Sequence, residues 1–219
     1  MLIEAPVSTP KSTTRKIDIK EQESLSSWNL VHPILAYVDK NSFLFLKLQQ
    51  DWWPFNKQGL GHEKQYGVNN IKWRPAAAAT LALGSQNGIL IWRFAVVNGN
   101  LQFAKHLPSA TVLSSGHHVT SLTWSPDGKW LIAGIKDLSG LVLWDVSCGV
   151  YQMLGPFSWI ESIPLFRKRT INCIWTDDGE YLLQILADNG FRIWYFFPAL
   201  NSKGNRNLDV FILLYKSRS

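Results

Sequence analysis

The chain has 219 residues, of which 46 % are apolar and 17 % are charged, so it can bury a sizeable core and is not a disordered chain. It has no apolar run of the ~18 residues that a transmembrane helix needs, and its first residues lack the apolar segment of a secretory signal. Its two cysteines, Cys148 and Cys173, do not have a metal-ligand spacing, which favours a reducing intracellular compartment.

The first predicted unit of structure covers about residues 28–50 and is the weakest. Two apolar runs typical of strands, 35–38 and 43–48, are separated by the polar turn 39–42. The aromatic cluster Trp52-Trp53-Pro54-Phe55 follows. It is either a partner-binding loop or a cover that packs over the first unit, and both interpretations stay open at this stage.

The later units share one order of strands and turns. The strand VTSLTW (119–124) leads into Ser125-Pro126-Asp127-Gly128, whose proline and glycine suit a type I turn. A second strand (129–135) and a third, LVLWDV (141–146), follow, and the third is apolar almost throughout, as expected of a strand buried on both faces. The same order recurs before and after this stretch. We predict a three-strand meander in each unit, with room for a fourth strand.

Two ladders of tryptophan set the period of the repeat. One ladder ends the first strand of each later unit with steps of 51 residues, and the other lies in the third strand with steps of 52 and 50. Six tryptophans on two phased ladders indicate a repeated supersecondary unit. The first ladder is Trp73, Trp124 and Trp175, and the second is Trp92, Trp144 and Trp194.

These units resemble the WD40 repeat. They have its length and its Trp-containing strands, and the third unit has the Gly116-His117 and Trp144-Asp145 pairs that mark the family. The resemblance implies an all-β, WD40-type β-propeller, present as an incomplete arc of about four blades. The repeat region would be 28–200, with blades at about 28–50, 66–97, 116–149 and 168–197. Residues 1–27 are expected to be disordered or poorly ordered.

The resemblance also implies a hydrogen-bonded set of His, Ser or Thr, Asp and Trp within each blade. His117 and Trp144 fit this set in the third blade, where Ala133 stands in place of the serine. Asp188 and Trp194 fit it in the fourth. Some blades therefore depart from the family pattern, while the packing pattern is kept.

Within the family, the chain resembles the aladin-like nucleoporins in the runs 71–94, 116–134 and 191–194. This resemblance implies a non-enzymatic scaffold of the nuclear pore complex at the nuclear envelope, bound to other nucleoporins including a transmembrane one, and linked to nucleocytoplasmic transport. The alternative is a WD40 adaptor in a signalling or ubiquitin-ligase complex. A nucleic-acid binder, suggested by the net charge of +6, is the third hypothesis, but basic and aromatic residues do not alternate on a shared face.

Sequence signatures of enzymes are missing. There is no phosphate-binding glycine loop, no HExxH and no GxSxG. His117-His118 is interpreted as a structural cap, Asp177-Asp178 as a turn and Arg167-Lys168-Arg169 as a solvated loop. We therefore expect no catalytic residue, cofactor, metal or small-molecule substrate.

The length of the chain raises the question of closure. A ring of seven blades needs ~300 residues at ~40–45 per blade, which is more than this chain has. Residues 201–219 lack the Trp and the turn of a fifth unit, so we expect them to lie outside the repeats as a truncated tail. The chain is expected to be a piece of a larger propeller or to close by pairing with another chain, with a four-blade ring as the alternative.

Overall fold

The computed structural model describes most of the chain, and the structural statements below are confined to that part. The described residues are 25–29, 31–48, 59–75, 79–97, 100–102, 109–136, 140–146, 149–154, 169–187, 189–200 and 206–216. Within these ranges all regular structure is β-strand. The described residues contain no helix of the length and apolar character needed to cross a membrane.

Four antiparallel sheets follow one another along the chain, and we call them blades 1 to 4. Neighbouring strands in each sheet are neighbours in sequence, apart from a hairpin inserted in blade 2. Blade 1 consists of β1 (Ser26–Trp28), β2 (Ile34–Val38) and β3 (Leu44–Leu48). Blade 2 consists of β4 (Asn70–Trp73), β5 (Thr80–Ser85), β6 (Gly88–Arg93) and β9 (Ser109–Ser115), with the hairpin β7 (Ala95–Val97) and β8 (Asn100–Gln102) between β6 and β9.

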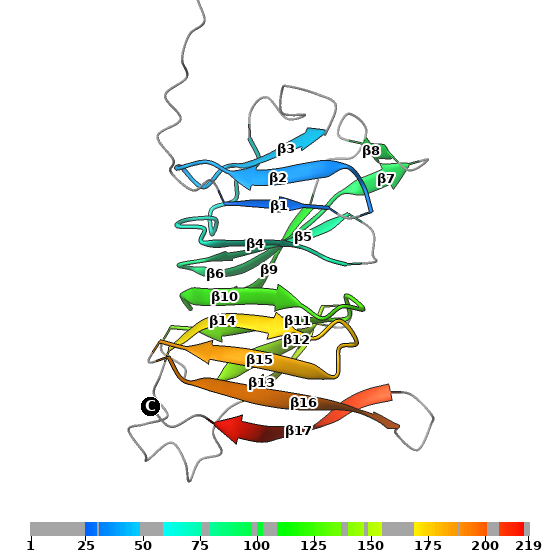
Figure 1. Cartoon of the computed structure of the whole chain (residues 1–219). Helices are drawn as coiled ribbons and strands as arrows, with labels where there is room; N and C mark the ends of the chain where they lie inside the picture. Colours follow the sequence, from blue (N-terminus) through cyan, green and yellow to red (C-terminus); the bar gives the residue numbers. More distant parts are fainter. Residues whose placement is uncertain are drawn as a thin grey trace, which may run out of the picture.

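Blades 3 and 4 repeat the arrangement with four strands each. Blade 3 consists of β10 (Val119–Trp124), β11 (Trp130–Ile135), β12 (Leu141–Asp145) and β13 (Val150–Leu154). Blade 4 consists of β14 (Thr170–Trp175), β15 (Tyr181–Leu186), β16 (Phe191–Leu200) and β17 (Arg206–Lys216). The blades are stacked in chain order, with blade 1, in blue, and blade 4, from yellow to red, at opposite ends of the stack (Figure 1). The described strands thus form an open arc.

The turn after the first strand of blade 3 forms as its sequence predicts. Gly128 N donates to Ser125 O at 2.8 Å, and Gly128 has a φ of 69°, which favours glycine. The Asp127 carboxylate accepts from Ser125 Oγ at 2.6 Å and from Lys129 N at 3.0 Å. Blade 4 builds the same turn on Asp178, whose pKa is lowered by the hydrogen bond from the Thr176 hydroxyl. The two turns are therefore equivalent parts of the repeat.

The C-terminal segment differs from its sequence-based expectation. Residues 206–216, which we expected outside the repeats, form β17 and pair with β16 as the fourth strand of blade 4. The segment lacks the tryptophan and turn of a repeat unit, but a fourth strand needs only an extended run with high strand propensity, which VFILLY (210–215) supplies. The first sheet also begins two residues before position 28, at Ser26.

The hydrophobic core is divided among the junctions between blades. We call the side of a blade that packs against the next blade its leading face, and the side that packs against the preceding blade its trailing face. The alternation of side chains along each strand assigns successive residues to opposite faces. The three core clusters join blades 1 and 2, blades 2 and 3, and blades 3 and 4. Each blade is thus stabilised by its neighbours rather than by a core of its own.

Candidate functional site

The first tryptophan ladder connects successive blades by hydrogen bonds. Trp73 Nε1 donates to the carbonyl oxygen of Ser27 at 2.9 Å, and Trp124 Nε1 donates to that of Lys72 at 3.1 Å. In both cases the acceptor is the residue just before the equivalent tryptophan of the preceding blade. Trp175 departs from the pattern, because its buried Nε1 has no hydrogen-bond acceptor among the described residues. Its ring packs on Phe196 instead, with 4.4 Å between centroids.

This difference predicts unequal effects of the same substitution. Trp124→Phe removes the bond to Lys72 and weakens the contact with Arg74, whose guanidinium lies 5.6 Å from the Trp124 ring centroid. Trp175→Phe removes an N–H that has no described acceptor. We expect Trp124→Phe to lower the free energy of unfolding by about 1–2 kcal/mol more than Trp175→Phe. Urea unfolding of the two variants measures the difference, and equal losses would contradict the assigned contacts.

In two blades, the tryptophan of the second ladder donates a hydrogen bond to a glutamine side chain. Trp92 Nε1 donates to Gln65 Oε1 and Trp194 Nε1 donates to Gln184 Oε1, each at 3.0 Å. Sequence reasoning missed both glutamines, because Gln65 lies in a loop and Gln184 in a strand, so they share no phase of the repeat. The one visible signal was a polar residue in the middle of the apolar run YLLQIL (181–186).

Gln184 lies at the centre of a buried polar cluster in blade 4. Its Nε2 donates to Thr170 Oγ1 at 2.7 Å, and its Oε1 also lies 3.5 Å from an Arg192 guanidinium nitrogen. Gln184 and Thr170 are fully buried and Arg192 is 1 % exposed. Burial lowers the pKa of the Arg192 guanidinium. Trp194, which the family resemblance placed in a set of His, Ser or Thr, Asp and Trp, is thus hydrogen-bonded to Gln184.

His117 and Trp144, the members of that set predicted in blade 3, lie in different surroundings. His117 is exposed, whereas Trp144 is buried in the core between blades 2 and 3. His118, not His117, reaches a neighbouring blade: its Nε2 lies 3.2 Å from the side-chain nitrogen of Asn69. Asp145 is partly exposed opposite Trp130. The Asp188 prediction lies outside the described residues, as does the aromatic cluster at 52–55.

Cys173 is a packing residue at the junction of blades 3 and 4. It is 4 % exposed, lies 3.6 Å from Ser121 Oγ, and belongs to the core cluster of that junction. Burial raises the pKa of its thiol to about 12, although the Ser121 hydroxyl opposes this shift. The neutral thiol therefore contributes stability that is present below its ordinary pKa of 9.0 and is lost as the pH rises from there toward about 12.

We expect Cys173 to be nearly inert in the folded chain. In a Cys148→Ser background, an aromatic disulfide reagent at pH 8 should react at least ~1000-fold more slowly with the native chain than with the urea-unfolded chain, because the thiolate is the reactive form. The absorbance of the released thiolate gives both rates. Reaction of the native chain at the unfolded rate would show that Cys173 is accessible.

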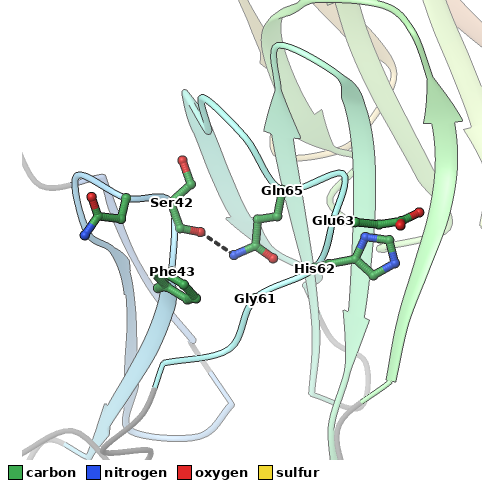
Figure 2. Close-up of a pocket in the computed structure, with 7 residues that line it drawn as sticks. Ser42, Phe43, Gly61, His62, Glu63 and Gln65 are labelled. Atoms are coloured by element: carbon green, nitrogen blue, oxygen red, sulfur yellow. Dashed lines mark hydrogen bonds between the residues drawn. The ribbon is translucent and has the colours of Figure 1, made fainter.

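A cavity of about 400 Å³ lies where the β2–β3 turn faces the loop that enters blade 2. It is lined by Asn41, Ser42, Phe43, Gly61, His62, Glu63 and Gln65 (Figure 2). Gln65 holds the two walls together, since its Nε2 donates to Ser42 O at 2.5 Å and to Leu60 O at 3.1 Å. The Asp39 carboxylate fixes the turn by accepting from Asn41 N at 3.0 Å and Phe43 N at 2.8 Å.

The chemistry of this cavity suits protein contact. Phe43 is 43 % exposed and Tyr66, next to Gln65, is 66 % exposed, so two aromatic side chains are accessible near it. Figure 2 shows His62 and Glu63 pointing away from Phe43. Within the described ranges, no three His, Cys, Asp or Glu side chains gather as a metal site. The cavity therefore offers aromatic area with polar groups at its rim.

Comparisons with known proteins agree with the fold. A profile for the WD domain, G-beta repeat, matches residues 109–145. The solved β-propeller domain of Cps50 (Swd1) from Myceliophteria thermophila superposes with a TM-score of 0.63 and 14 % identity, over 90 % of this chain and 58 % of that chain. The chain therefore has the fold of a WD40-type β-propeller, seen here as a partial, open arc.

Parts of the chain are also similar to two curated proteins. It is 26 % identical over 141 residues to aladin from Arabidopsis thaliana, a match that covers 56 % of this chain and 31 % of that protein. It is also 28 % identical over 139 residues to a chromatin assembly factor 1 subunit FAS2 homolog from Oryza sativa subsp. japonica, over 61 % of this chain and 26 % of that protein. The matches span about a third or less of either relative.

Proposed function

We propose that this chain is a non-enzymatic scaffold that works in nuclear pore organisation and nucleocytoplasmic transport through contacts with nucleoporins, including a transmembrane one. The similarity to aladin carries the proposal. The stacked blades support it, because rigid sheets joined by accessible loops present several surfaces to protein partners. The cavity between blades 1 and 2, with Phe43 and Tyr66 exposed, is the described surface best suited to such a contact.

Proximity labelling in cells tests the proposal. A biotin ligase fused to the chain is expected to label nucleoporins, and fluorescence is expected to form a rim at the nuclear envelope. Phe43→Ser should weaken the labelling, because it removes exposed aromatic area at the cavity. Met153→Ser is the matched control, since Met153 is 53 % exposed on β13 of another blade. Labelling without nucleoporins would contradict the nuclear-pore role.

A second candidate is an adaptor in another assembly. The similarity to a chromatin assembly factor 1 subunit favours an assembly of that kind over a ubiquitin-ligase or signalling complex. The same labelling experiment separates the candidates. Chromatin assembly subunits in place of nucleoporins, with diffuse nuclear fluorescence, would favour this second function.

A further inference from the structure

Each internal junction uses the same positions of the repeat. In the second strand, the residue paired with the first-strand tryptophan lies on the trailing face, so the residues one and three places later lie on the leading face. The third-strand residues that pair with these positions lie on the same leading face. The leading-face core residues are Ala36, Val38, Leu44 and Leu46 in blade 1, Ala82, Ile89 and Ile91 in blade 2, and Ile132, Leu141 and Leu143 in blade 3.

Blade 4 has an apolar leading face that no further described blade covers. Its equivalent positions hold Leu183, Ile185 and Ile193, with Leu183 opposite Ile193 in the register of β15 and β16. All three are partly exposed, and none belongs to the core clusters formed by the described residues. Ile174 in the first strand is 48 % exposed. This end of the arc thus presents an apolar face of the kind that blades 1 to 3 bury. The position of Ile185 is Val38 in blade 1, but it is glycine in blades 2 and 3, at Gly84 and Gly134.

Blade 1 presents the opposite half of a junction. Its trailing-face positions hold Leu35, Tyr37 and Phe45, which are partly exposed, and Trp28, which is 51 % exposed. The position paired with Leu35 holds Lys47, where blades 2 to 4 carry the tryptophan of the second ladder. Tyr37 and Phe45 stack with 5.3 Å between ring centroids, so the face is ordered and aromatic. In blades 2, 3 and 4 the trailing face is buried against the preceding blade.

The two ends of the arc also offer a donor and an acceptor equivalent to those of the first tryptophan ladder. At the junctions of blades 1 and 2 and of blades 2 and 3, the donor is the tryptophan that ends the first strand, and the acceptor is the carbonyl just before the preceding blade's tryptophan. Trp175, at the junction of blades 3 and 4, has no described acceptor. By the same rule Trp28 supplies the donor at the free end of blade 1. The carbonyl of Ile174, just before Trp175, supplies the acceptor at the free end of blade 4.

We propose that a second copy of this chain closes the arc head to tail, with the leading face of blade 4 in each copy packed on the trailing face of blade 1 in the other. One chain carries both halves of the junction, which is why the occupant is another copy. Two arcs of four blades give eight, within the ~4–8 blades of known propellers. Two equivalent heterologous contacts close a ring with two-fold symmetry and leave no terminal face open. The proposal is independent of the nuclear-pore role.

Mass measurement on the purified 219-residue chain is the first test. Light scattering after size exclusion is expected to give twice the 24.9 kDa chain mass at micromolar concentration. A monomer at ~100 µM, or a ladder of open oligomers, overturns the proposed ring. If the chain dimerises, hydrogen exchange in β2 and β15 should become slower as the protein concentration rises. Exchange in β13 should not change, which gives a control that needs no variant.

Complementary variants test the head-to-tail arrangement. Ile185→Lys damages the leading face and Tyr37→Glu damages the trailing face, so each variant alone is expected to be monomeric. An equimolar mixture is expected to restore a dimer, because one junction is then native and the other joins opposite charges. Met153→Glu, away from both faces, is expected to stay dimeric. A dimer that survives either single variant, or a mixture that stays monomeric while circular dichroism shows folded chains, rejects this arrangement.

Discussion

Gly128→Ala is expected to lower the free energy of unfolding by about 3–4 kcal/mol. Two costs combine. The φ of 69° at Gly128 is unfavourable for a residue with a Cβ, by about 1–2 kcal/mol. The added Cβ would also meet the carbonyl oxygen of Pro75 in blade 2, which is backbone and cannot rotate away. Urea unfolding measures the loss.

Gly116→Ala is the matched control. Gly116 has a φ of 78°, but no heavy atom lies within 4 Å of a Cβ built on it. Its replacement should cost only the conformational term of about 1–2 kcal/mol. Equal losses for the two variants would show that the contact between the blade 3 turn and Pro75 is loose. A larger loss for Gly128→Ala would show that this turn packs closely against blade 2, where Arg74 Nε also donates to Gly128 O at 2.6 Å.

Gln184→Leu is expected to destabilise the chain by a similar amount, about 3–4 kcal/mol. It deprives the Trp194 N–H and the Arg192 guanidinium of a buried acceptor and leaves the Thr170 hydroxyl without its donor. Removing one member of a buried polar cluster costs the desolvation of the groups that remain. Thermal and urea unfolding give the loss.

The double variant Gln184→Leu with Arg192→Leu separates this account from a simple packing defect. Replacing both partners with apolar residues removes the buried charge together with its acceptor, so the double variant is expected to be more stable than Gln184→Leu alone. If the two losses add, the polar cluster is not the cause. Thr170→Val serves as a smaller perturbation of the same cluster.

The repeated features of this fold could be predicted from the sequence, while the features unique to one blade could not. Tryptophan spacing located the first and third strands, and Pro-Asp-Gly located a turn, because these marks recur in phase. Gln65 and Gln184 satisfy equivalent tryptophans from different positions, so no repeat pattern exposes them. The strand β17 lacked the expected marks, since backbone pairing does not require them. The expectation about His117 came from the family resemblance, and the described contacts involve His118 instead.

The placement of the cores at the junctions determines how the arc loses its structure. A blade in the middle shares two cores with its neighbours, whereas blade 1 and blade 4 each share one. Stability in such an array is close to a sum of nearest-neighbour terms, so a single arc, without a second copy at its ends, should open first at the ends and then inward. Damage to blade 3 would weaken two junctions at once and divide the array into two short pieces. Cooperative unfolding of the whole chain therefore depends most on blades 2 and 3.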